Sequence, residues 1–198
     1  PKIRLSGVGE TIVYSDGLYM NSSDPSAKLK IKFQKLMEDH KRGYMNIIKK
    51  DVAFIPSAFT FSTWSNLILS CPQFTVFLEK IKKFYEDDKQ FQKYVKRDIE
   101  TAEKKINENT INYILEEVLL DFLVAKGMVR LQNDYVQDNE EWILHCYNGR
   151  PHRAHVYFHQ KNPLKIESDN PYQDCLYDLD AKKLYEYDRL DITTFFDN

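Results

Sequence analysis

A helical segment around residues 111–124 limits the fold of this chain more than any other part of its sequence, because it is apolar on two faces. One face carries the stripe Ile111, Ile114, Leu115, Val118, Leu119 and Phe122, which is the spacing of a buried helix face. The other side carries Ile106, Leu120 and Val124 together with Tyr113 and Glu117. Tyr113 and Glu117 are four residues apart and are therefore neighbours on the helix surface. A helix that is apolar on both sides is expected to be buried.

The carboxylate of Glu117 is the unusual group on this helix. A buried carboxylate is costly unless a charged or hydrogen-bonding group meets it. Two interpretations stay open at this point: Glu117 forms a structural ion pair with a Lys or Arg of a neighbouring helix, or it binds a ligand.

Composition places the chain among globular proteins. Its 198 residues are 42% hydrophobic and 14% aromatic, which is enough for one domain with a real core. No apolar run of about 18 residues is present, so no membrane span is expected. Cys71, Cys146 and Cys175 are far apart and lack metal or redox spacing, which indicates a reducing compartment and predicts a cytoplasmic location.

Charge is unevenly distributed along the chain. Residues 26–50 are rich in cations, namely Lys28, Lys30, Lys32, Lys35, Lys41, Arg42, Lys49 and Lys50. Such a basic helix is either a contact surface for a phosphate backbone or only a solvated face. The last thirty residues are acidic and either form a solvating extension or fold back onto the basic helix. We therefore divide the chain into residues 1–162 and an acidic C-terminal extension, 163–198.

The order of the expected elements predicts an α/β fold. A strand at Thr11–Tyr14 precedes a helix that Asp24 and Pro25 begin and that runs to about Ile48. A strand at 52–55 and an aromatic loop at 59–64 follow. Helices then extend from about 73 to 126, with breaks near 86–88 and 107–109, and Gly127 ends the last one. Strands are expected at 129–131, 142–147 and 154–158. A parallel central sheet is the default for this order.

Metal and cofactor motifs are not found. His145, His152, His155 and His159 are close in sequence, but in a strand only 155 and 159 share a face, and no cysteine or carboxylate completes a zinc site. The Gly7–Gly9 segment is too short for a dinucleotide fingerprint, and there is no Walker loop, so ATP use is not supported. We expect neither metal nor cofactor.

Tyr113, Glu117 and Tyr147 are the residues that remain for chemistry. A carboxylate in a pocket of low dielectric constant can hold a primary amine by a charge-assisted hydrogen bond. It also fixes that amine where it can attack. Two phenols beside it are suited to relaying protons.

Three segments taken in order resemble the C-terminal half of tRNA-dependent cyclodipeptide synthases (CDPSs): residues 84–91, 112–117 and 142–148. The likeness covers about residues 10–160 and is best over 77–148. It implies a Rossmann-like parallel sheet flanked by helices, similar to the catalytic domains of class I tyrosyl- and tryptophanyl-tRNA synthetases, in a single domain. The basic helix lies where the family carries its tRNA-contacting helix, which implies tRNA contacts by Lys28, Lys30, Lys32, Lys35, Lys41 and Arg42.

The family's chemistry is implied in the same way. A serine accepts an aminoacyl group from one charged tRNA, the amine of a second aminoacyl group attacks it, and the dipeptide closes to a diketopiperazine. Tyr113 and Glu117 match the pair that holds the amino group, and Tyr147 matches the tyrosine that assists later proton transfers. The implied partner is aminoacyl-tRNA, with neither DNA nor a membrane, and we expect a monomer.

The nucleophile motif is the main departure from the family. Ser6 follows a short apolar run, but Gly9 stands where the family has an asparagine, and the strand at Thr11 follows too closely for a helix between them. Three interpretations stay open: the chain lacks the family's first strand and helix, a segment is missing near residues 7–10, or the chemistry has changed. The alternative function is a non-catalytic relative that binds tRNA or protein. A third interpretation is an α/β domain in which the motif is coincidental.

Overall fold

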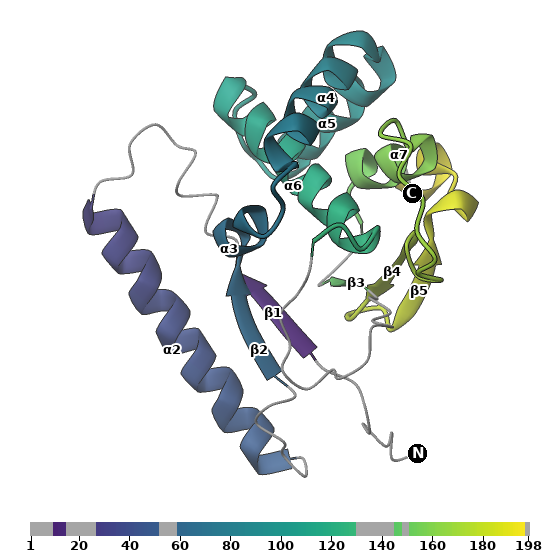
Figure 1. Ribbon diagram of the computed structural model, residues 1–198. Helices are drawn as coiled ribbons and strands as arrows, with labels where there is room; N and C mark the ends of the chain where they lie inside the picture. Colours follow the sequence, from purple (N-terminus) through teal and green to yellow (C-terminus); the bar gives the residue numbers. More distant parts are fainter. Residues whose placement is uncertain (1–9, 15–26, 52–58, 130–144, 148–150, 197–198) are drawn as a thin grey trace. The chain divides into compact units, whose positions relative to one another are not determined.

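The computed structural model describes residues 10–14, 27–51, 59–129, 145–147 and 151–196 (Figure 1). These residues belong to two compact units. One is drawn from residues 1–69 and 131–141, and the other from residues 70–130 and 142–198. Each unit has a sheet of its own.

The first unit is built on a parallel strand pair. Strand β1 (Glu10–Tyr14) pairs with β2 (Phe59–Thr63), with Ile12 opposite Phe61. Helix α2 (Ala27–Asp51) connects the two strands and lies beside them, and α3 (Trp64–Leu69) follows β2 (Figure 1). A parallel pair needs such a crossover connection, and a helix is its usual form.

Aromatic side chains hold α2 against this strand pair. The hydroxyl of Tyr14 lies 3.0 Å from Nδ1 of His40 on α2, and the ring of Tyr14 stacks on Phe61 at 6.3 Å between centroids. Tyr44 of α2 meets Phe61 edge to face at 6.4 Å. The partly buried rings of the first unit therefore lie between its helix and its strands.

The strand expected at Thr11–Tyr14 and the body of the following helix are confirmed. The aromatic loop expected at residues 59–64 is wrong, because Phe59–Thr63 is strand β2 and Trp64 begins α3. Aromatic and β-branched residues fill all of its positions except Ser62, and such a segment pairs readily once a partner strand is available. The helix start expected at Asp24 and Pro25 and the strand expected at 52–55 lie outside the described residues.

Three helices form the first part of the second unit: α4 (Phe74–Asp87), α5 (Lys89–Thr101) and α6 (Glu108–Ala125). The two breaks and the end predicted from the sequence are confirmed. Asp88 caps α5 by accepting the N–H of Phe91 at 2.8 Å. Asn107 forms a capping box with Thr110 at the start of α6. Gly127, at φ 69°, stands just after its end.

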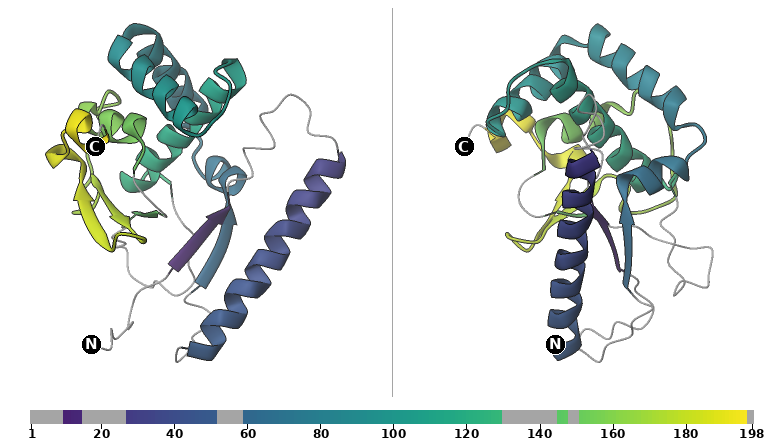
Figure 2. Two further views of the ribbon diagram at one scale, coloured as in Figure 1. Left: turned by 180° about the vertical axis from the view of Figure 1, so that it is seen from behind. Right: turned by 90° about the vertical axis from the view of Figure 1, so that its left-hand side faces the viewer.

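Helix α6 is the central helix of this unit. Its predicted stripe is buried from Ile114 to Phe122, as are Leu120 and Val124 on the second side, whereas Ile111 is half-buried. The expectation that Ile106 lies on the second buried side of this helix is wrong, since Ile106 precedes the helix and is 42% exposed. Figure 2 shows α4, α5 and α6, in teal, packed side by side. An aromatic cluster joins them to the next helix, with Phe122 5.0 Å and Phe91 5.6 Å from the ring of Phe158.

Residues 154–158 are helical, so the strand expected there is wrong. They belong to α7 (Arg153–Lys161). Ala154, Val156 and Phe158 alternate as in a half-buried strand, but His155 between them and His159 after them are buried as well. A short apolar run of this kind does not distinguish a strand from a buried helix segment. The carboxylate of Asp98 on α5 favours the helix, because it accepts the N–H of Ala154 at 2.8 Å in the first turn.

The second sheet joins β3 (His145–Tyr147) in parallel to β4 (Cys175–Asp178), which pairs antiparallel with β5 (Lys183–Glu186). The short helices η2 (Tyr187–Arg189) and α8 (Ile192–Phe196) follow. A small core packs these elements on α7 and contains Val156, Leu176, Tyr185, Tyr187 and Ile192. The segment after residue 162 is thus folded onto α7, and the domain boundary expected there stays a prediction.

The α/β class and the parallel strand pairing expected from the sequence are confirmed. None of the helices that the structure describes is long and apolar enough to cross a membrane.

Candidate functional site

Helix α6 holds Tyr113 and Glu117 one turn apart, as the spacing predicted. Both side chains are half-buried rather than fully buried, although Ile114 and Val118 next to them are in the core. Both also interact with neighbouring groups. This half-burial corrects the expectation of a deeply buried carboxylate.

Tyr147 and Ser6 are the other two predicted catalytic residues. Tyr147 lies in β3, opposite Asp178 of β4, and its side chain is outside the described part of the structure. Ser6 lies outside the described residues altogether. The grouping of Tyr113, Glu117 and Tyr147 in one site therefore stays a prediction.

The predicted tRNA-binding residues all lie on α2. The structure describes the side chains of Lys35, Lys41 and Arg42, and it places Lys28, Lys30 and Lys32 by their backbone alone. Lys35 and Arg42 are exposed. Arg42 forms an exposed ion pair with Asp39 at 3.6 Å, and the Lys41 ammonium lies 5.1 Å from the centre of the Phe61 ring. Exposed pairs of this kind are weak, so this surface is available to phosphates.

A buried polar network lies one turn beyond Glu117, and sequence reasoning missed it. His159 has no exposed side-chain surface, and its Nε2 lies 3.3 Å from Oδ2 of Asp121 on α6. Its Nδ1 lies 3.2 Å from Oδ1 of Asp174. The same oxygen of Asp174 accepts from the Lys126 ammonium at 3.2 Å, and Lys126 also donates to Gln173 at 2.8 Å. The network joins α6, α7 and the segment before β4.

The pKa of Asp174 shows the balance of forces in this network. Burial opposes ionisation of its carboxyl group, but the hydrogen bond to His159 and the positive charge of Lys126 outweigh burial and lower the pKa below 3.8. The members of the network come from three separate parts of the chain, so no local spacing in the sequence could have revealed it.

The histidines are arranged differently from the strand-based expectation. On a helix, His152, His155 and His159 follow one another at spacings of three and four residues and share a face. The His152 and His155 rings are 5.4 Å apart, and they line a small cavity with Asp121, Pro151, Leu176 and Tyr187. Its volume of about 10 Å³ has room for roughly one water molecule. Among the described residues, no group of three His, Cys, Asp or Glu side chains is arranged to hold a metal ion.

Asp98 is a second buried carboxylate that the sequence did not reveal. It is 2% exposed and accepts the backbone N–H groups of Arg153 at 3.3 Å and Ala154 at 2.8 Å. The guanidinium of Arg153 lies 3.5 Å from the same carboxylate. Burial raises the pKa of Asp98, while these bonds and the nearby charges oppose the shift. Asp98 thus fixes the start of α7 and the position of Arg153 together.

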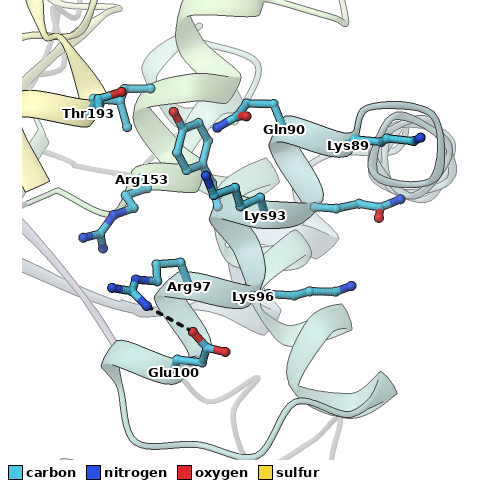
Figure 3. A pocket seen from close by; sticks show the side chains of 11 residues that line it. Lys89, Gln90, Lys93, Lys96, Arg97, Glu100, Arg153 and Thr193 are labelled. Atoms are coloured by element: carbon cyan, nitrogen blue, oxygen red, sulfur yellow. Dashed lines mark ion pairs between the residues drawn. The ribbon is translucent and has the colours of Figure 1, made fainter. Parts of the chain in front are cut away.

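Arg153 borders an open groove of about 540 Å³ beside α5 (Figure 3). Helix α5 contributes most of its lining, α7 contributes Arg153, and α8 contributes Ile192 and Thr193. Five of the lining side chains are cationic: Lys89, Lys93, Lys96, Arg97 and Arg153. Among the described residues that line it, Glu100 is the one acid. The cations of α5 recur at helical spacing in the sequence, a signal that the sequence analysis did not use.

Comparison with known proteins gives a likeness of fold. No protein-family model and no curated protein sequence matches this chain. Among solved structures, a CDPS from Fluoribacter dumoffii is similar, with a TM-score of 0.51 and 15% sequence identity over 76% of this chain and 67% of that one. At this identity the likeness establishes a shared fold.

Proposed function

We propose that this protein is a cyclodipeptide-synthase-like aminoacyltransferase that joins aminoacyl groups from two charged tRNAs into a diketopiperazine. The observation that carries the proposal is the likeness of its fold to that of a CDPS. The placement of Tyr113 and Glu117 on one half-buried strip of α6 supports it, because an amine-binding carboxylate needs both partial burial and access.

Each residue has a chemical role in this proposal. The ionised carboxylate of Glu117 accepts hydrogen bonds from the ammonium group of the aminoacyl moiety, and Tyr113 adds a phenol one turn away. Ser6 is the assigned nucleophile: its hydroxyl attacks the ester carbonyl, and the ribose hydroxyl of the tRNA leaves with a proton. The amine of the second aminoacyl group, still esterified to its tRNA, then attacks the acyl-serine carbonyl; an amide bond forms and the Ser6 oxygen leaves with a proton. Tyr147 moves a proton during the closing step, when the free amine of the dipeptide attacks the ester to the second tRNA and the ribose hydroxyl of that tRNA leaves.

Binding of the tRNA body is assigned to the cations of α2, namely Lys28, Lys30, Lys32, Lys35, Lys41 and Arg42. The proposal places the reaction in the cytoplasm, with the protein as a monomer. It calls for no metal or other cofactor, and for no contact with DNA or a membrane.

The test is mass spectrometry of the medium of cells that express the chain. The comparison includes an empty vector, Glu117→Gln and the matched control Glu116→Gln. Glu116 is the adjacent residue, is also half-buried, and points about 100° away around the helix. We expect a new diketopiperazine from the wild type and from the control variant, and a loss of about 100-fold or more in Glu117→Gln. Product retained in Glu117→Gln with unchanged yield would refute the assigned role of the carboxylate.

A second candidate function is a non-catalytic tRNA-binding relative with the same fold. The observation that favours it is Gly9, which stands where the resemblance requires an asparagine after the serine. Only the transferase forms a covalent aminoacyl-enzyme intermediate; the binding protein forms none. Incubation with radiolabelled aminoacyl-tRNA followed by denaturing electrophoresis should label the transferase and leave the binding protein unlabelled. A salt-dependent complex without label would favour the second candidate.

A further inference from the structure

The cationic groove along α5 is distinct from the predicted catalytic residues and from α2. Its five cations face a single acid among the lining residues, so its electrostatic potential is positive over most of its length. Figure 3 shows Lys89 and Lys96 extending to one side of α5, while Arg97 and Arg153 lie on the other. Lys93 lies between them. The lining cations thus lie on both sides of α5.

These cations are available to a ligand. Lys89, Lys93 and Lys96 are exposed, and no ion pair within the described part of the chain engages them. Arg97 pairs with Glu100 at 3.6 Å, but both side chains are more than half exposed. Such a surface pair is worth less than about 1 kcal/mol. A ligand that brings negative charge can therefore replace Glu100 as the partner of Arg97 at little cost.

Arg153 is held in place before any ligand arrives. Its side chain is only 12% exposed and is paired with the buried Asp98. Its Nη2 donates to the carbonyl oxygen of Phe196 at 3.1 Å, and the guanidinium lies 4.5 Å from the centre of the Phe196 ring. A guanidinium fixed in this way loses little side-chain entropy when it binds an anion. It gives the groove a rigid anchor beside the exposed lysines of α5.

The arrangement fits a chain of phosphates better than a single anion. Lys89, Lys93 and Lys96 succeed one another about one helical turn, or about 5.4 Å, apart along α5, and the groove is open. Gln90, Gln92 and Thr193 add uncharged hydrogen-bond donors, and the half-buried ring of Tyr94 adds an aromatic surface. Cations interleaved with amides and an aromatic ring are typical of nucleic-acid grooves. A membrane fits poorly, because Ile192 is the one aliphatic lining residue and it is buried.

We propose that the groove formed by α5, Arg153 and α8 binds the phosphate backbone of an RNA. The choice of RNA over DNA rests on the proposed function, in which the substrates are charged tRNAs. The binding itself does not depend on that function, since the groove lies outside the residues assigned to catalysis and to α2.

The test measures binding of deacylated tRNA to the full-length chain by fluorescence anisotropy over a series of salt concentrations. The groove variant carries Lys89→Gln, Lys93→Gln and Lys96→Gln. The matched control variant removes the same total charge at three exposed lysines of the same unit that do not line the groove: Lys83→Gln, Lys104→Gln and Lys105→Gln. All six side chains are exposed, so both variants should keep the circular dichroism spectrum and melting temperature of the wild type.

The groove variant should bind tRNA at least about tenfold more weakly at moderate salt. The slope of log K against log salt should fall in magnitude by about 2–3, because three phosphate contacts are lost. The control variant should match the wild type in both quantities. Equal effects of the two triple variants would show that only net charge matters and would overturn the proposal, as would no effect of either.

Two further arms separate the ligand classes. Duplex DNA that binds as tightly as tRNA, with the same dependence on the groove, would overturn the choice of RNA. A groove variant that loses binding to phosphatidylserine vesicles but keeps tRNA binding would make the groove a membrane contact instead. These arms measure binding, whereas mass spectrometry of the medium measures the product, so a failure of this inference can be told apart from a failure of the proposed function.

Discussion

Replacing Asp174 with asparagine tests the buried network of the second unit. Oδ1 of Asp174 is 3.2 Å from both the Lys126 ammonium and Nδ1 of His159. The side chains of Lys126 and His159 are 3% and 0% exposed, whereas that of Asp174 is 26% exposed. An uncharged asparagine leaves the Lys126 charge buried with Gln173 as its remaining partner in the network, at 2.8 Å.

Removing one partner of a buried charge pair costs about 3–5 kcal/mol. We expect the lower end, about 3 kcal/mol of unfolding free energy, because Gln173 remains and Asp174 is partly solvated. With a urea dependence of about 2 kcal/mol per molar, the unfolding midpoint falls by about 1–2 M. The loss should depend on pH. The pKa of Asp174 is lowered from 3.8 on folding, so its contribution is present above that value and disappears as the pH falls through the lower, folded-state pKa.

The assay is urea unfolding followed by circular dichroism at pH 7 and at successively lower pH. Asp169→Asn is the control, since Asp169 is an exposed acid in the same segment. The difference between wild type and Asp174→Asn should shrink in acid, while Asp169→Asn should track the wild type throughout. A cost below about 1 kcal/mol at pH 7, or a difference that stays constant in acid, would refute the reasoning.

Three local predictions follow from the caps and from one hydrogen bond. Asn107→Ala removes the capping box of α6 and should cost about 1 kcal/mol of unfolding free energy by urea titration; no change would mean that the cap is not formed. Gly127→Ala should cost about 1–2 kcal/mol through its backbone alone, because φ is 69° and an added Cβ meets no atom within 4 Å; a stabilised variant would contradict this. Burial and the hydrogen bond to Asp88 raise the pKa of Tyr157 to about 12. In an ultraviolet titration, Tyr157→Phe should therefore have one fewer tyrosine that ionises at high pH than the wild type has. Asp88→Asn should lower the pKa of Tyr157.

Local signals in the sequence were sufficient to place α4, α5 and α6 of the second unit. Asp88, Asn107 and Gly127 act through hydrogen bonds and dihedral angles within a few residues of themselves, so their effect can be predicted without knowing the fold. The neighbourhood of Tyr113 and Glu117 is local in the same sense, because helical periodicity places residues four apart on one side.

Burial was predicted less well, because it depends on what covers each face. The second side of α6 is covered at Leu120 and Val124 but only partly at Tyr113 and Glu117. Ile106, which the apolar pattern assigned to the same side, is exposed before the helix begins. A pattern of apolar residues indicates which faces can be buried, and the packing partners decide how completely they are.

The segment at 154–158 shows the limit of pattern reading most clearly. Its apolar alternation fitted a strand, and the choice of a helix depends on Asp98, which binds the first backbone N–H groups of α7 from 55 residues away. The same change of element placed His159 between Asp121 and Asp174, 38 and 15 residues from it. Carboxylates brought together over such distances cannot be inferred from spacing along the chain.

The sequence by itself therefore determined α4, α5 and α6 with the breaks between them, the α/β class and the cationic helix α2, because these follow from interactions between near neighbours. The tertiary structure alone decided the helical state of α7, the pairing of β3 with β4, the network around His159 and the groove beside Arg153. Each of these depends on groups that are distant in sequence, and their free energies are set by burial and geometry that exist only once the chain has folded.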